Sequence, residues 1–205
     1  MRMKGGGQVT ATSVPNSPLN IGADGGISID FGRIKAPDRI YDADVSWIVR
    51  GNGFVSMFFA KRSVDDPATL ESRVELKYAP EAFVNHLWGN SREFHGALKE
   101  HLATWPTDPN LVAVDGRTLR FVGKSHSEWV NFDIIARAGS HGTIDFYYLP
   151  PFGVSQLMQR HSVNQLAVVP VVRVMLTIHE IDRLLDAAAA VAEEAKKYLP
   201  AEMLK

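Results

Sequence analysis

Residues 44–61 read DVSWIVRGNGFVSMFFAK, and this stretch decides the fold. Apolar and polar side chains alternate on both sides of Gly51-Asn52-Gly53, which is the pattern of two β-strands that bury one face. Asn followed by Gly favours a tight turn, because such a turn needs positive φ angles that these residues adopt most readily. The stretch therefore predicts an antiparallel β-hairpin, with Val55, Met57 and Phe59 on its buried face.

A third strand and a helix follow the hairpin. Residues 73–78 alternate again and predict the strand. Pro80 and Glu81 then begin the helix, since the missing N–H group of a proline costs nothing in a first turn. We expect Gly89-Asn90-Ser91 to bend or split this helix. Its buried stripe consists of Phe83, Leu87, Phe94, Leu98 and Leu102.

The second half of the chain repeats this order of elements. Residues 111–122 predict a small hairpin, and residues 129–137, 143–149 and 171–177 predict longer strands. In the strand 129–137 the residues expected to face inward are Val130, Phe132, Ile134 and Ala136. A helix follows, because Thr177 and Glu180 are spaced as a capping box. Its apolar residues recur at helical spacing: Ile181, Leu184, Leu185, Ala188, Val191, Ala192, Ala195 and Tyr198.

Two short segments one hundred residues apart resemble each other. Arg73-Val74-Glu75-Leu76 and Arg173-Val174-Met175-Leu176 agree at three of four positions. We therefore predict an α+β fold of two pseudo-repeated units, each an antiparallel β-sheet followed by an amphipathic α-helix, with chance similarity as the alternative. Residues 1–26, rich in Gly, Ser, Thr, Pro and Asn, predict an extended N-terminal arm, with a disordered tail as the alternative. Residues 27–105 and 106–205 are the two units.

Composition excludes several classes of protein. The 205 residues carry a formal charge of −1 and no cysteine, which excludes a disulfide framework, a thiol nucleophile and a thiolate metal site. No apolar run approaches the ~18–20 residues that cross a bilayer. Balanced charge argues against a protein that coats nucleic acid by bulk electrostatics. We expect a cytoplasmic protein that does not bind membranes.

The stretch from Tyr41 to about His101 resembles a small family of uncharacterised bacterial proteins. The residues that carry this resemblance are Phe54 to Phe59, Ser72 to Leu76, Pro80-Glu81 and the helix through Leu87. In the order of its elements alone, the chain is also similar to Whirly-type and PUR-type binders of single-stranded nucleic acid and to SecB-type export chaperones. The uncharacterised family has no known activity, and the other similarities are of shape alone, from which function does not follow.

Motifs for catalysis and for cofactors do not converge. Gly5-Gly6-Gly7 lacks the Lys-Ser/Thr pair of a phosphate loop. His86, His95 and His101 are spaced so that they lie on different faces of one helix, which is unlike a zinc site. Ser125-His126 are sequence neighbours, and neighbours seldom form a nucleophile–base pair. We therefore predict no catalytic residue, no cofactor and no metal.

The sheet faces directed away from the helices are the predicted interaction surface, because aromatic and arginine side chains alternate there. Its residues are Ile48, Arg50, Phe58, Arg73 and Lys77 in the first unit and Trp129, Asn131, Arg137, Tyr147 and Arg173 in the second. The alternative is a half-solvated sheet or the joint between the two halves. A second candidate is the long loop 150–170, in which a partner would contact Gln156, Met158, Arg160 and His161.

Three functions follow from this sequence. The first is a non-catalytic homo-oligomeric protein that binds other proteins, as a scaffold, adaptor or chaperone-like assembly subunit. The alternative is a single-stranded nucleic-acid-binding protein that uses the aromatic and arginine side chains. The third is a hydrolase or small-ligand protein with its site in the long loop.

Overall fold

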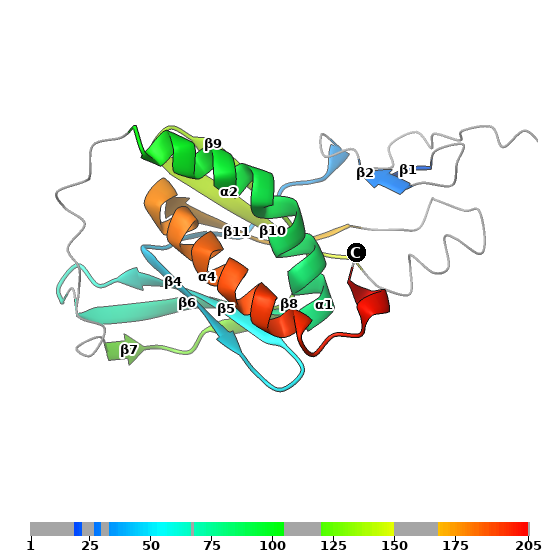
Figure 1. The fold of residues 1–205 in the computed structure, drawn as a ribbon. Helices are drawn as coiled ribbons and strands as arrows, with labels where there is room; N and C mark the ends of the chain where they lie inside the picture. The colour runs from blue at the N-terminus through cyan, green and yellow to red at the C-terminus, as the bar shows by residue number, and fades with distance from the viewer. Residues whose placement is uncertain are drawn as a thin grey trace, which may run out of the picture. The chain divides into compact units, whose positions relative to one another are not determined.

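The computed structural model describes residues 19–21, 27–29, 33–66, 68–104, 120–149 and 168–204. The chain divides into two units, one of Met1–Ala36 and Leu149–Val169 and the other of Pro37–Tyr148 and Pro170–Lys205. In the first unit, β1 (Leu19–Ile21) and β2 (Ile27–Ile29) form an antiparallel pair. The remaining elements build the second unit (Figure 1).

A five-stranded sheet contains the hairpin predicted from residues 44–61. Its strands are β4 (Val45–Arg50), β5 (Val55–Arg62), β6 (Thr69–Tyr78), β7 (Arg120–Val122) and β8 (His126–Trp129). β4, β5 and β6 are antiparallel neighbours, whereas β7 and β8 both pair with β6 in parallel. Gly53 in the turn has a φ of 82°, which confirms the need for glycine there. The predicted partner of β7, residues 111–114, lies outside the described residues.

A four-stranded sheet has the order β3-β11-β10-β9. Its strands are β3 (Ile40–Asp42), β9 (Phe132–Ala138), β10 (His141–Tyr148) and β11 (Val169–Thr177). β9 and β10 are antiparallel, and β3 pairs with β11 in parallel. The sheet therefore combines a strand from near residue 40 with strands from the second half of the chain.

The two sheets are joined where the chain passes from one to the other. The amide N–H of Ala43 donates to Met175 of the four-stranded sheet at 3.0 Å, and that of Asp44 donates to Ala60 of the five-stranded sheet at 3.0 Å. At the second crossing, Val130 donates to Lys77 at 2.9 Å and the next residue donates to Tyr147 at 3.1 Å. Strands that bend from sheet to sheet form the corners of two packed sheets.

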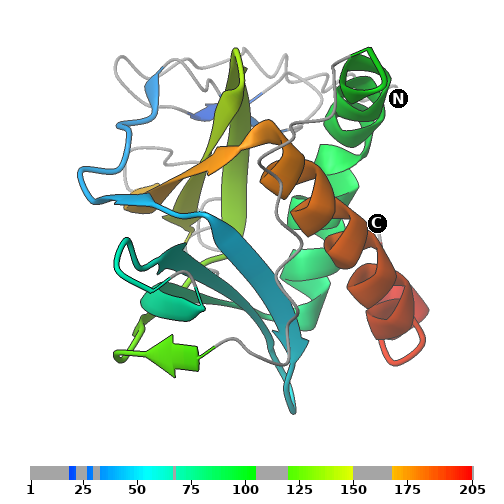
Figure 2. The same ribbon diagram turned by 90° about the vertical axis from the view of Figure 1, so that its left-hand side faces the viewer.

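Two helical segments lie side by side against the sheets (Figures 1 and 2). The first is continuous over residues 80–102 and consists of α1 (Pro80–Ala82), η2 (Phe83–Trp88) and α2 (Gly89–Leu102). The second is α4 (Ile178–Lys196), and a short 3-10 turn, η5 (Ala201–Met203), follows it. The Thr177 hydroxyl accepts a hydrogen bond from the N–H of Glu180 at 3.2 Å, as a capping residue does.

The interruption predicted at Gly89 is wrong in position. Gly89 has helical angles (φ −57°, ψ −47°), and the irregular turn is the π-helical segment η2 that precedes it. A π-helical turn widens the backbone ring by one residue while keeping the helix continuous. The helix therefore neither splits nor ends at the Gly-Asn-Ser sequence.

The core of the second unit lies between the sheets and the two helical segments. Phe59 of β5 and Phe146 of β10 contact each other at the centre, with ring centroids 5.7 Å apart, and both are fully buried. The predicted inward residues of β11 are confirmed there, and so are those of α4 from Ile181 to Ala195, including Val172, Val174 and Leu185, each with no exposed surface. Tyr198 is the exception, because it lies past the end of α4 and has 67% of its surface exposed. Among the described residues, no helix is both long and apolar enough to cross a membrane.

The inward side predicted for residues 129–137 is wrong for Ile134 and Ala136, although Val130 and Phe132 are buried as predicted. Val130 is buried, but the strand then restarts at Phe132 in the other sheet. There Asp133 lies opposite Phe146 and Ile135 lies opposite Ile144, so the odd-numbered residues face the core. The bend at the sheet corner resets which residues point inward, and alternation along the sequence does not reveal it.

Candidate functional site

Aromatic side chains gather on the face of the five-stranded sheet opposite the core. Trp47 lies across from Phe58, which alternates with the buried Met57 and Phe59 along β5. The rings of Trp47 and Phe58 stack with centroids 5.1 Å apart and planes 5° from parallel. Phe121 of β7 approaches Trp47 to 4.9 Å between centroids. Three strands therefore contribute to one aromatic cluster.

Trp129 and Phe54 extend this cluster along the sheet. Trp129 at the end of β8 meets Phe54 of the hairpin turn edge-on, with centroids 6.4 Å apart. The Lys77 ammonium group lies 5.4 Å from the centre of the Phe54 ring. We call the surface formed by Trp47, Phe54, Phe58, Phe121 and Trp129 the aromatic face. Phe121 and Trp129 expose 56% and 53% of their surface, which is unusual for large aromatic residues.

Charged side chains of β6 occur as pairs of opposite sign. Lys77 lies 3.6 Å from Glu75, and Arg73 lies 3.0 Å from Glu71. Each cation is therefore largely neutralised by a neighbour on its own strand. A surface with apolar rings and both signs of charge differs from the uninterrupted basic stripe that tracks a nucleic-acid backbone.

Three of the ten predicted interaction residues meet on this sheet face: Phe58, Lys77 and Trp129. Arg73 lies where the register between β5 and β6 shifts, so the pairing does not assign it to this face. Ile48 and Arg50 do not lie on it, because the hairpin register places Ile48 opposite the buried Met57. Trp47, which was expected on the opposite face of β4, lies on this sheet face instead of Ile48 and Arg50. The alternation of β4 is correct, but both of its faces carry apolar residues, so the sequence alone did not distinguish them.

Of the five interaction residues predicted from the second unit, four lie outside this sheet face. Asn131 is at the corner between the sheets, and Arg137 is exposed on β9 opposite Gly142. Tyr147 has only 2% of its surface exposed, and Arg173 is bound to a neighbouring carboxylate. The predicted partner loop residues Gln156, Met158, Arg160 and His161 lie outside the described residues.

Arg173 forms a two-pronged pair with Asp145. Its Nε and Nη2 atoms donate to the two oxygens of this carboxylate, each at 2.6 Å. These hydrogen bonds raise the pKa of Arg173, and burial, more than the nearby Asp145, raises the pKa of Tyr147 to about 12. The ion pair links β10 to β11.

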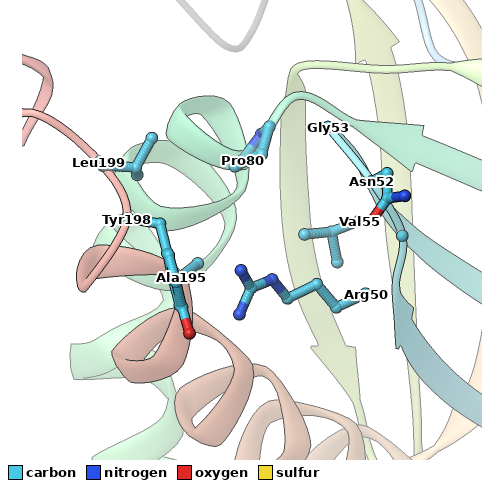
Figure 3. Close-up of a pocket in the computed structure, with 9 residues that line it drawn as sticks. Arg50, Asn52, Gly53, Val55, Pro80, Ala195, Tyr198 and Leu199 are labelled. Atoms are coloured by element: carbon cyan, nitrogen blue, oxygen red, sulfur yellow. The ribbon is translucent and has the colours of Figure 1, made fainter.

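A pocket of about 270 Å³ lies between the hairpin turn and the end of α4 (Figure 3). Arg50 extends into it, with its guanidinium carbon 4.2 Å from the centre of the Tyr198 ring and Nη1 3.7 Å from Glu194. Its lining includes the backbone of Gly51–Gly53 and the apolar residues Val55, Pro80, Ala195 and Leu199. The described lining contains no histidine, carboxylate, serine or cysteine, so it offers no nucleophile–base pair.

A buried polar network fixes α4 on β4. The Glu180 Oε1 atom accepts hydrogen bonds from the N–H and the hydroxyl of Ser46, the latter at 2.7 Å. Arg183 donates to Glu180 Oε2 at 2.9 Å and to the carbonyl of Ser46 at 2.9 Å. Each of these polar groups has a hydrogen-bond partner, which is typical of a network that stabilises the fold.

Comparison with known proteins yields no relative. No family model matches the chain, and neither a curated protein nor a solved structure matches it. The resemblances drawn from the sequence therefore gain no support.

Proposed function

We propose that this protein is a non-catalytic, homo-oligomeric protein-binding protein, and that a second copy of the chain docks on the aromatic face. The observation that carries the proposal is the exposure of Trp129 and Phe121 beside the stacked rings of Trp47 and Phe58. Aromatic residues of this kind are the usual energetic centres of protein interfaces. Exposed apolar patches on soluble proteins commonly mark such contacts.

The charge pattern supports a second copy as the occupant. Twofold symmetric interfaces are self-complementary, since each surface meets an identical one. The aromatic face carries Lys77 beside Glu75, so each copy offers a cation to the other copy's carboxylate and a carboxylate to its cation. The bends at Ala43 and Val130 join the two sheets, which favours contact through faces over the addition of strands at an edge.

Single-stranded nucleic acid is the second candidate, because bases stack on exposed aromatic rings at about 1–3 kcal/mol each. The position of Lys77 above the Phe54 ring favours it. The pairing of Lys77 and Arg73 with carboxylates weighs against it. Titration with a fluorescent oligonucleotide at low salt separates the two functions, since a nucleic-acid binder gives a signal that falls as salt is raised.

The internal duplication and the N-terminal arm expected from the sequence are also part of this proposal. Internal duplication is supported by the order of elements: β4, β5 and β6 precede the helical residues 80–102, and β9, β10 and β11 precede α4. We propose that residues 1–26 form an arm that contributes to self-association in the cytoplasm. The wider role, as a scaffold, adaptor or chaperone-like subunit, requires a further protein partner.

Sedimentation velocity of three variants tests the proposed interface. Trp129→Ala and Phe121→Ala each remove an exposed ring from the aromatic face, and Val64→Ala is the control because Val64 is 94% exposed and is not part of that face. Loss of a central aromatic residue costs about 2 kcal/mol, so we expect self-association about 30-fold weaker in the two aromatic variants. The control should associate like the wild-type protein.

Two results would contradict the proposal. One is a wild-type protein that sediments as a monomer at every concentration. The other is an association constant that Trp129→Ala and Phe121→Ala leave unchanged while circular dichroism shows both variants to be folded.

A further inference from the structure

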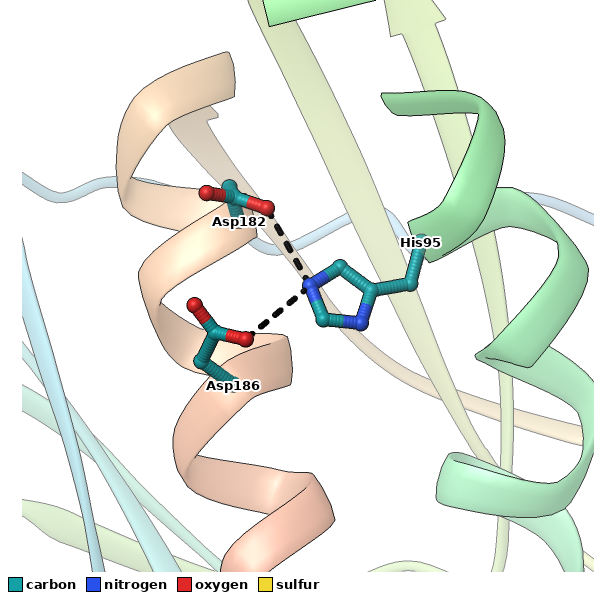
Figure 4. A group of neighbouring side chains, drawn as sticks. All are labelled: His95, Asp182 and Asp186. Atoms are coloured by element: carbon teal, nitrogen blue, oxygen red, sulfur yellow. Dashed lines mark hydrogen bonds and ion pairs between the residues drawn. The ribbon is translucent and has the colours of Figure 1, made fainter. Parts of the chain in front are cut away.

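His95 on α2 and two aspartates on α4 converge at the contact between these helices (Figure 4). The His95 Nε2 atom lies 3.1 Å from Asp182 Oδ1 and 3.6 Å from Asp186 Oδ1. One ligand atom from each of the three side chains falls within 4.8 Å of the others. The aromatic face is on another part of the molecule, so this cluster is independent of the proposed function.

The two helices hold the three side chains in place. Asp182 and Asp186 are four residues apart on α4 and therefore project from the same face of the helix. His95 has 6% of its surface exposed, and its ring meets Trp88 edge-on with centroids 5.8 Å apart. Figure 4 shows both carboxylates directed at the same ring nitrogen. A ligand set built on rigid helices with one buried member is preorganised for a cation.

We propose that His95, Asp182 and Asp186 bind a divalent metal ion of the zinc class. One imidazole nitrogen and two carboxylate oxygens are ligands that Zn²⁺ accepts at about 2.0–2.2 Å, which places tetrahedral ligand atoms roughly 3.3–3.6 Å apart. The distances of 3.1 and 3.6 Å already lie close to this spacing. Asp186 is 54% exposed at its side chain, so the remaining coordination position opens toward solvent.

Lys99 competes for the same carboxylate. Its ammonium group lies 2.6 Å from Asp186 Oδ1, and this hydrogen bond, together with the charges of Asp186 and Asp182, raises the pKa of Lys99. Two carboxylates thus face a single fixed positive charge across the helix contact. A divalent metal ion supplies two positive charges, which balance both carboxylates, and displaces the lysine from the ligand oxygen.

Because Lys99 would compete with a metal ion for Asp186, removing the charge of Lys99 distinguishes a metal site from a purely structural contact between the helices. If the cluster binds metal, removal of the Lys99 ammonium group frees a ligand and tightens metal binding. If the cluster is only a set of ion pairs, the same change removes one pair and produces no metal affinity. Replacement of Lys99 by methionine keeps most of the length of the side chain and therefore tests mainly the charge.

Isothermal titration calorimetry of the full-length protein with ZnCl₂ measures the affinity and the number of Zn²⁺ ions bound. Co²⁺ serves as a spectroscopic probe of four-coordinate geometry. We expect one Zn²⁺ per chain. His95→Ala and Asp182→Asn should each weaken binding at least ~100-fold, because loss of an outer-shell partner alone already costs about 10- to 100-fold. Lys99→Met should tighten it several-fold, at least ~3-fold, by removing the competing cation.

Matched controls use pairs of the same chemistry outside the cluster. Lys197→Met removes a lysine that pairs with Glu194, and His126→Ala removes an exposed histidine 2.8 Å from Glu128. Neither should change the affinity for Zn²⁺. Three outcomes overturn the proposal: no Zn²⁺ binding by the wild-type protein, binding retained by the folded Asp182→Asn variant, or weaker binding in Lys99→Met.

Discussion

Asp133 is the residue whose ionisation the fold alters most clearly. It lies in the core opposite Phe146, with 8% of its surface exposed, and burial raises the pKa of its carboxyl group from 3.8 to about 7. The Tyr78 hydroxyl donates a hydrogen bond to it at 3.3 Å, which favours the charged form but does not offset the loss of water. The carboxyl group is therefore neutral in the folded protein at mildly acidic pH.

Replacement of Asp133 by asparagine should remove a pH dependence of stability. In the unfolded chain this carboxyl ionises above its ordinary pKa of 3.8, while the folded state holds its proton until about pH 7. The stabilising effect is complete below pH 3.8 and is lost as the pH rises to about 7. Between pH 5 and about pH 7 the wild-type protein should lose roughly 2–3 kcal/mol relative to Asp133→Asn, at ~1.4 kcal/mol per pH unit.

Urea denaturation at several pH values measures this difference. Asp65→Asn, which replaces an exposed carboxylate, serves as the control. Stabilities of wild type and Asp133→Asn that stay parallel across this pH range would show that the carboxyl group is not desolvated as described.

At the scale of single elements, close approach between α4 and β10 sets a requirement for glycine. A Cβ atom on Gly142 would lie 2.5 Å from Ile181 Cδ1 and 2.9 Å from the carbonyl oxygen of Ala136. The carbonyl belongs to the neighbouring strand and cannot move aside cheaply. Gly96 in α2 is the opposite case, since a Cβ atom added there would meet nothing within 4 Å outside its own stretch of helix.

The two glycines therefore predict stability changes of opposite sign. Gly142→Ala should destabilise the protein by about 1–3 kcal/mol through overpacking. Gly96→Ala should stabilise it by about 0.5–1 kcal/mol, because alanine favours the helix and restricts the unfolded chain. Thermal unfolding of both variants provides the measurement, and a Gly142→Ala protein as stable as Gly96→Ala would rule out the tight contact with Ile181.

Elements formed by local sequence were predictable, whereas their partners were not. The Asn52-Gly53 turn, the Pro80 helix start and the Thr177 cap follow from interactions among near neighbours. Pairing of β3 with β11 joins residues more than one hundred positions apart, and alternation contains no information on such partners. His95 and Asp182 are 87 residues apart, so histidine spacing within one helix could not reveal their contact.

At the scale of the whole molecule, the first residues of the chain offer a separate test of self-association. The composition of residues 1–26 predicts an extended arm with no packed core of its own. Deletion of these residues should weaken self-association, because an arm that lies along a second copy adds contact area. Sedimentation of truncated and full-length protein at equal concentration gives the comparison, and identical species would exclude a role for the arm.

The central claim places a second copy of the chain on the aromatic face, and hydroxyl-radical footprinting at two protein concentrations tests it most directly. At concentrations well above the dissociation constant, oxidation of Trp129 and Phe121 should fall severalfold, while oxidation of the exposed Val64 stays constant. Equal oxidation of Trp129 and Phe121 in dilute and associated protein would show that the interface lies elsewhere.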